Sequence, residues 1–265
     1  MEPAEVAEDF MAHVPLPASG QRRNLGNAWL VHQPGPVPLF ANVSGLRARD
    51  LTEVDVVQEQ ADQWFAALGR RHFVWFLGPH SRPAGARDHL LANGATVLAT
   101  STAMTLDHPP ASGSTSQVEV REVLSAEELL EYWKLMTPAG GPGMDADAAV
   151  EHLVRSNDAA WREYVGMHGA RRYYLAYLED APVAAGGVAF TTHGVAILTG
   201  GATSAQARGN GCYRALLARR WAAAVEAGAS HLAVVASDES RPILDRSGFA
   251  SVAQVTFLRQ GVRSS

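Results

Sequence analysis

Two periodicities divide the second half of the chain into strands and helices. Alternating or continuous apolar runs predict strands at residues 173–178, 183–191, 195–203, 231–236 and 251–259. Apolar residues three and four positions apart predict helices after Ser125, near Asp145 and after Gly211, and a shorter helix over 241–247. Short turns between the first three strands predict antiparallel hairpins. The whole pattern predicts an α/β fold with a mixed, mainly antiparallel sheet.

The first half of the chain repeats part of this pattern. The apolar segment 72–77 is followed by Ser-Arg-Pro at 81–83, and the apolar segment 231–236 is followed by Ser-Arg-Pro at 240–242. Both segments begin with histidine, and the same offset separates the histidines, serines, arginines and prolines. Matched strands around a matched tripeptide indicate an internal structural repeat.

A linker separates the two copies. Residues 106–117 are rich in proline, glycine and hydroxyl side chains and contain little to bury. We therefore predict two domains, residues 1–112 and residues 117–265. In the first domain a helix is expected over 51–68, with Asp50 or Thr52 as its cap.

A glycine-rich turn joins strand 195–203 to the following helix. Its sequence, from Arg208 to Leu217, is Arg-Gly-Asn-Gly-Cys-Tyr-Arg-Ala-Leu-Leu. Glycines allow close approach of the backbone to an anion, and the unpaired amides of a helix start point at it. The turn fits neither of two other nucleotide-binding motifs. A Walker loop would need Gly-Lys-Ser/Thr here, and a Rossmann fingerprint would lie early in the chain and be followed by an acidic residue about 20 positions later. A plain turn without a ligand stays open as an alternative.

The turn resembles the acetyl-CoA loop of the GNAT (GCN5-related) N-acetyltransferase superfamily, Arg-x-x-Gly-x-(Gly/Ala), in the frame that begins at Arg208. A second frame begins at Gln206 and also fits. Ser247-Gly248-Phe249 resembles the Leu-Gly-Phe of that family, and the likeness covers residues 117–261. The resemblance implies two GNAT-like domains, each with a mainly antiparallel sheet flanked by helices. The first is degenerate, because residues 41–49 contain one glycine and no Gly-x-Gly.

The resemblance also implies acetyl-CoA, or another acyl-CoA, as co-substrate. The end of strand 195–203 splays from its neighbour in that family and bonds the pantetheine arm, and Gly200-Gly201 suits a bulge there. Tyr213 stands where a small residue is usual. Cys212 has either a thiol pKa lowered by the helix start or an inert buried thiol. The expected cofactor-binding residues are Gly201, Ala202, Thr203, Arg208, Gly209, Asn210, Gly211, Cys212, Tyr213, Arg214 and Ser237.

The catalytic residues are not identified by the sequence. The positions at which the family often carries a Glu base and a Tyr acid hold Ile197 and Leu244 here. Proton transfer by a water or a substrate group is one explanation, and a binding domain without turnover is another. The weak substitute candidates are Ser237, Glu239, His193 and Tyr213, together with Asp238; each has a structural explanation as a cap, a helix-start charge, a turn residue or a core residue.

The function expected from this resemblance is transfer of an acyl group from acyl-CoA to a small-molecule amine, by direct attack in a ternary complex. One alternative is a non-catalytic CoA-binding or CoA-sensing module. Another is a protein or peptide N-acetyltransferase, which needs an open groove that the first domain would obstruct. We expect the first domain to form a wall of the substrate cleft and to cover a sheet edge.

The composition of the chain argues against several classes of partner. The formal charge is −5, with 22 Lys and Arg against 27 Asp and Glu, which argues against nucleic acid. The single cysteine excludes an internal disulfide, and the histidines lack metal-ligand spacing, so no metal is expected. No apolar run reaches the length of a membrane span, and the N-terminus lacks signal-peptide features. We expect a soluble, cytoplasmic monomer or homodimer without nucleic-acid or membrane partners.

Overall fold

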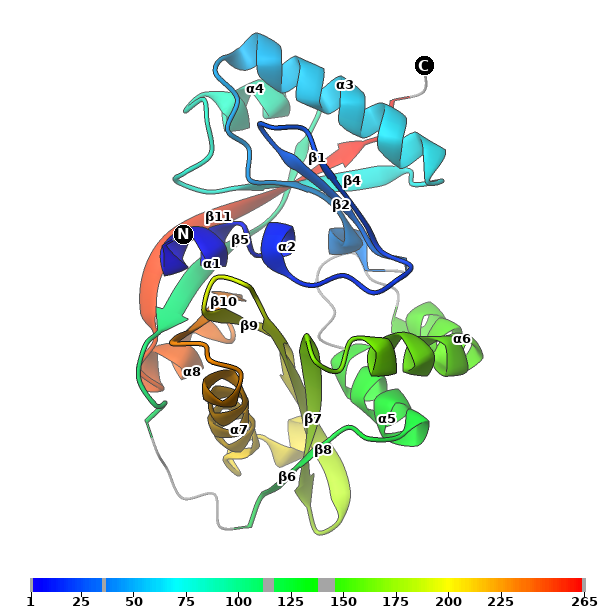
Figure 1. Cartoon of the computed structure of the whole chain (residues 1–265), viewed down its shortest axis with the longest axis vertical. Helices are drawn as coiled ribbons and strands as arrows, with labels where there is room; N and C mark the ends of the chain where they lie inside the picture. The colour runs from blue at the N-terminus through cyan, green and yellow to red at the C-terminus, as the bar shows by residue number, and fades with distance from the viewer. Residues whose placement is uncertain (1, 35–36, 112–116, 138–145, 264–265) are drawn as a thin grey trace.

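The computed structural model describes residues 2–34, 37–111, 117–137 and 146–263 (Figure 1). The first half contains α1 (Pro3–Glu8), α2 (Phe10–His13), β1 (Gln21–Asn24), β2 (Trp29–His32), η1 (Pro38–Phe40), β3 (Ala41–Ser44), α3 (Leu51–Ala67), β4 (His72–Leu77), α4 (Ala86–Ala92) and β5 (Thr96–Leu106). The second half contains β6 (Glu119–Glu122), α5 (Ala126–Met136), α6 (Ala146–Gly166), β7 (Arg171–Leu178), β8 (Ala181–Phe190), β9 (Val195–Thr203), η3 (Ala205–Ala207), α7 (Cys212–Glu226), β10 (His231–Ala236), α8 (Arg241–Arg246) and β11 (Ala250–Gly261).

The described strands form one 11-stranded sheet, in the order β1-β2-β3-β4-β11-β5-β10-β9-β8-β7-β6. Only β3–β4 and β9–β10 are parallel, and all other neighbours are antiparallel. Each half therefore has the same succession: three antiparallel strands, a helix, and a strand parallel to the third. This succession confirms the predicted fold class and gives the sequence repeat a structural counterpart.

The two halves exchange their last strands. β5 ends the first half, yet it lies between β11 and β10 of the second half. β11 ends the second half, yet its other edge pairs with β4 of the first, from Thr256 opposite Leu77 to Gly261 opposite His72. The sheet is thus continuous across both halves. The boundary between residues 112 and 117 stays a prediction, and residues 112–116 lie outside the described part of the chain.

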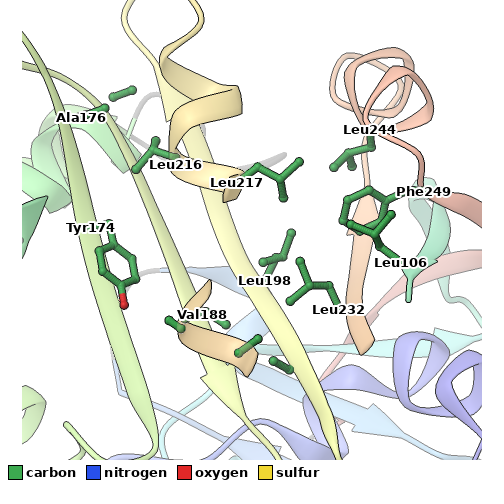
Figure 2. Packing of buried hydrophobic residues seen from close by; sticks show 14 of the residues in the cluster. Leu106, Tyr174, Ala176, Val188, Leu198, Leu216, Leu217, Leu232, Leu244 and Phe249 are labelled. Carbon is green, nitrogen blue, oxygen red and sulfur yellow. The ribbon is translucent and has the colours of Figure 1, made fainter. Parts of the chain in front are cut away.

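Helices cover both faces of this sheet. On one face of the second half, α7 and α8 pack Leu216, Leu217 and Leu244 onto strand residues such as Leu198 and Leu232 (Figure 2). On the opposite face α5 and α6 cover the outer strands. The short helices α1 and α2 cover the middle of the sheet on that same face, where strands of both halves meet (Figure 1). α3 and α4 cover the first half.

Local signals explain most of the helix starts. The carboxylate of Asp50 accepts the amide of Glu53 at 2.9 Å and caps α3, which decides between the two predicted caps. Ser125 and Glu128 have the spacing of a capping box, and Ser125 Oγ accepts the amide of Glu128 at 3.2 Å. The helices α1 and α2 were not predicted, although Val6, Ala7, Phe10 and Met11 recur at helical spacing in this segment.

In the described ranges, no helix combines the length and the apolar character that crossing a bilayer would need. The same ranges contain no group of three or more His, Cys, Asp or Glu side chains arranged to hold a metal ion.

Candidate functional site

The parallel strands β9 and β10 pair over only three residues. Val195, Ala196 and Ile197 of β9 lie opposite His231, Leu232 and Ala233 of β10. β9 then continues to Thr203 and β10 to Ala236 without further pairing between them. The end of β9 therefore has an edge that no described strand occupies, as predicted for a strand that adds a ligand's extended arm.

A bulge lies at the free end of β9. Its register with β8 shifts between Ala185 and Gly187, so two residues of β9, Gly200 and Gly201, oppose one residue of β8. Gly200 has a positive φ of 75°. A Cβ on Gly200 would lie 2.4 Å from Cε of Met136, and one on Gly201 would lie 2.8 Å from the ring of Tyr213. The positive φ of Gly200 and the close ring of Tyr213 at Gly201 both favour glycine, and the predicted bulge is confirmed.

The turn before α7 forms a cradle of backbone amides. Gly209 and Gly211 have φ of 86° and 81°, and a Cβ added to Gly209 would meet no atom within 4 Å. In the part of the chain that the structure describes, the amides of Gly209, Tyr213 and Arg214 donate to no acceptor. These amides stand at the positive end of a 15-residue helix. The cradle is open, and it suits an anion such as a diphosphate.

The other side chains of this turn are placed as follows. Arg208 and Arg214 are exposed. Asn210 is exposed too, but its amide nitrogen folds back to the carbonyl of Ala207 at 3.2 Å. Cys212 is buried, and burial raises the pKa of its thiol. An activated thiol at this helix start is therefore wrong, and Cys212 packs in the core below the cradle.

Tyr213 packs against the sheet. Its ring covers Gly201 and belongs to the partly buried residues around the core under α7. The guanidinium carbon of Arg220 lies 5.5 Å from the centre of the ring. The ring of Tyr213 therefore fills the space that the missing side chain of Gly201 leaves, and packing is its evident role.

Ser237 and Glu239 follow β10 and are exposed. Ser237 Oγ accepts the amide of Ser240 at 3.4 Å and lies 3.3 Å from Ser240 Oγ, so it orders the turn into α8. Asp238 and Glu239 form no ion pair with any residue in the described ranges. These residues lie at the open end of β10, on the same side as the cradle.

The structure does not bring His193 to this site. It lies in the turn before β9, whereas the cradle follows the end of that strand. Nine residues of extended strand separate the two by roughly 26 Å. His193 contacts His13 of α2 instead, with ring centres 5.3 Å apart.

The two positions at which the resemblance would place a base and an acid are core residues. Ile197 is 1% exposed and packs under α1 and α2, and Leu244 is the fully buried residue of α8. Neither position can exchange a proton. Residues 138–145, part of the glycine- and proline-rich loop that the resemblance places beside the acceptor, lie outside the described residues.

Two residues that the sequence did not single out hold the bulge. Tyr132 Oη donates to the carbonyl of Thr199 at 3.4 Å, and burial raises the pKa of Tyr132 well above its usual range, so the hydroxyl keeps its proton. Arg220 Nη1 donates to the carbonyl of Gly200 at 2.9 Å. The sequence contains a signal for Arg220, which lies four residues after Leu216 and three before Ala223, on the apolar stripe of α7.

Solved structures share this architecture along most of the chain. A GCN5-related N-acetyltransferase from Kribbella flavida aligns with a TM-score of 0.72 and 19% identity over 97% of this chain and 95% of its own. A tandem GNAT protein from the clavulanic acid biosynthesis pathway aligns with a TM-score of 0.64 and 14% identity over 94% and 85%. A GCN5-related N-acetyltransferase from Sphaerobacter thermophilus aligns with a TM-score of 0.59 and 14% identity over 90% and 78%.

Neither the protein-family models nor the curated proteins give a match to this sequence. The structural likeness, which extends over both halves, is therefore a likeness of fold. The chain has the GNAT fold in its tandem form.

Proposed function

We propose that this protein is an acyl-CoA-dependent N-acyltransferase, with acetyl-CoA as the expected donor and a small-molecule amine as acceptor. One observation carries the proposal: β9 parts from β10 after three residue pairs and leads, through the short helix η3, to an open amide cradle at the start of α7. A free strand edge followed by a helix-start anion site matches an extended arm that ends in a diphosphate.

The residues present fit such a carrier. The amides of Gly209, Tyr213 and Arg214 are free to bind the diphosphate, and nothing fills the space above Gly209. Met136 and Tyr213 cover Gly200 and Gly201 from opposite sides of the strand. With both faces of the strand covered, the pantetheine arm can bind only along the edge of β9 that faces β10. Bound acyl-CoA would supply an activated acyl group as a thioester.

The reaction proposed is direct transfer. The amine nitrogen bonds to the acyl carbon, the carbon–sulfur bond breaks, and the proton lost by the nitrogen is taken up by the thiolate. Since Ile197 and Leu244 cannot move this proton, we assign the transfer to a water or to a group of the acceptor. Orientation alone contributes several kcal/mol to such reactions, so the protein's part is to align the two reactants.

A small acceptor is favoured over a peptide by the position of the first half. Val6 and Ala7 of α1 are fully buried against the face of the sheet that carries Ile197 and Ala233. This cover lies beside the last β9–β10 pair, where an extended peptide would need an open groove (Figure 1).

A second function is favoured by one specific observation. Because both usual proton-transfer positions are buried apolar residues, a CoA-binding module without turnover also fits the site. Such a module would be stabilised by CoA yet would release no thiol from acetyl-CoA with any acceptor.

The test has two arms. Calorimetry with CoA measures binding, and a thiol assay with acetyl-CoA and a panel of small amines and short peptides measures turnover. Binding with thiol release from a small amine supports the proposal. Binding without release from any acceptor supports the binding module, and the absence of binding overturns both.

A further inference from the structure

Arg220 is a buried cation without a counter-charge. Its side chain is fully buried under β8 and β9, and no carboxylate of the described residues pairs with it. Removing an unpaired charge from water costs free energy, so a buried guanidinium needs hydrogen bonds that replace its lost hydration. Its partners are carbonyls: Leu216 of its own helix at 3.2 Å, Gly200 of β9 at 2.9 Å and Gly187 of β8 at 3.5 Å.

Glycines make room for this side chain. A Cβ on Gly186 would lie 3.0 Å from both Cζ and Nη1 of Arg220, which is tighter than ordinary packing. Gly186 is the residue of β8 that opposes the bulge in β9. The guanidinium therefore sits directly against the irregular part of the two strands and replaces ladder hydrogen bonds that the bulge disrupts.

Tyr132 acts on the same bulge from the other helix layer. It belongs to the cluster under α5 and α6, whereas α7 packs on the opposite face. Tyr132 holds the carbonyl of Thr199 and Arg220 holds that of Gly200. Because a trans peptide points its C=O and N–H in opposite directions, the amides of Gly200 and Gly201 point away from Tyr132 and Arg220. A cation on the carbonyl of Gly200 also strengthens the amide of Gly201 as a donor.

Buried polar atoms without partners in the described part of the chain lie along this part of β9, with Thr199 Oγ1 on the face of α5 and Arg220 Nη2 on the face of α7. Arg220 Nη2, Thr199 Oγ1 and Thr203 Oγ1 are buried and have no partner among the described residues. All three lie on or against the last five residues of β9. Buried polar groups without partners indicate a ligand or water that completes the site.

We propose that Arg220 is a positioning residue for the acyl-carrier arm, which it serves by fixing the bulge in β9 and polarising the peptide between Gly200 and Gly201. This inference rests on the proposed function. It adds a residue that never touches the reacting atoms but sets where the free end of β9 stands and how strongly its amide donates.

The experiment compares variants of neighbouring arginines on α7. Arg220→Met keeps the length and removes the charge. Arg219→Met is the matched control, because Arg219 is partly exposed, pairs with Glu122 and Glu226, and lies against the ring of Tyr174 of β7. Arg220→Lys keeps the charge with fewer donors. Calorimetry measures the Kd for CoA together with the number of binding sites per chain.

We expect Arg220→Met to raise the Kd for CoA by about tenfold or more, Arg220→Lys to recover part of the affinity, and Arg219→Met to change it by less than about twofold. A purely structural role of Arg220 would lower the number of competent sites and leave the Kd of the folded fraction unchanged. The amide resonance of Gly201, recorded without CoA, should shift in Arg220→Met and stay in place in Arg219→Met.

A second variant covers the case in which Arg220→Met does not fold. Gly186→Ala keeps the charge but displaces the guanidinium, and it should raise the Kd in the same direction. If the native protein binds CoA and the Kd and Gly201 resonance of the Arg220 and Gly186 variants equal those of Arg219→Met, the positioning role is overturned alone. If the native protein binds no CoA, the proposed function fails and the inference falls with it.

Discussion

The two halves of the molecule differ in what binds the backbone amides of the segments that follow their parallel strands. After β3, the amide of Gly45 is bound by the carboxylate of Asp9 at 3.1 Å, and Arg47 binds the same carboxylate at 2.7 Å. After β4, the amide of His80 is bound by the carboxylate of Glu8 at 3.0 Å. In the segment that leads from β9 into α7, the cradle amides are free of any acceptor among the described residues. In the first half, side chains of the protein stand where the second half has room for an anion.

The ends of β3 and β9 differ in the same way, one being closed and the other open. β3 ends at Ser44, and Leu46 beyond it is fully buried and accepts the amide of Arg82 at 3.0 Å. β9 instead runs six residues past its last pair with β10. One half has closed the gap between its parallel strands and the other keeps it open. The comparison shows that internal carboxylates and apolar residues can close the space after the third strand of a repeated fold with no change of topology.

The largest expected effect comes from separating the halves. A fragment of residues 117–265 lacks β5, which pairs with β10 and β11 along their lengths, so we expect it to show no cooperative thermal transition. The matched control is the full chain cleaved at a protease site placed within residues 112–116. There both pieces keep their strand partners and should elute together with nearly the native melting temperature. A fragment that melts cooperatively at the native temperature would contradict the exchange of strands.

The second largest effect is expected when a carboxylate is introduced at the cradle of the second half. Gly209→Asp places a carboxylate at the cradle, as Asp9 does at Gly45, and should weaken CoA binding by about tenfold to a hundredfold through repulsion of the diphosphate. Gly209→Asn is the control, since Asn tolerates the same positive φ of 86° without the charge. It should weaken binding by less than about threefold. Equal Kd values for the two variants in calorimetry would show that no anion binds there.

A third effect concerns Asp9, whose carboxylate binds the amide of Gly45 in the first half. Burial raises the pKa of Asp9 from 3.8 to about 6, although Arg47 opposes this shift. The stability linked to this carboxyl is therefore fully present below pH 4 and is lost as the pH rises to about 6, by up to about 3 kcal/mol. Urea unfolding across this range should show that slope in the native protein and not in Asp9→Asn. Asp88→Asn, at an exposed position, should keep the native slope.

The smallest effect is expected at Cys212. The thiol is buried and its pKa is raised, so alkylation by iodoacetamide at pH 8 should be slow until urea unfolds the protein. Cys212→Ala should change CoA affinity by less than about twofold, because only the backbone of this residue lies at the cradle. Rapid labelling of the folded protein would restore the hypothesis of an activated thiol.

Much of this molecule could be predicted from local pattern. The bounds of β9 and β10, the bulge at Gly200, and the capping box at Ser125 all follow from periodicity and turn chemistry within a few residues. The exchange of β5 and β11 could not be predicted in this way, because strand order depends on contacts between distant segments. The roles of Asp9 and Arg220 were hidden for another reason. A charged residue in a sequence is expected at the surface, and although Arg220 lies on the apolar stripe of α7, the partners of both side chains are seen only in the packed structure.

The interleaved strands have a consequence for synthesis on the ribosome. β4 emerges early, but β11, which covers its edge, follows more than half a chain length later. Until then β4 presents unpaired backbone groups, which are a template for association with other nascent chains. The first half can thus complete its tertiary structure only after the second half has been translated, so the order of translation differs from the order in which the two halves finish folding.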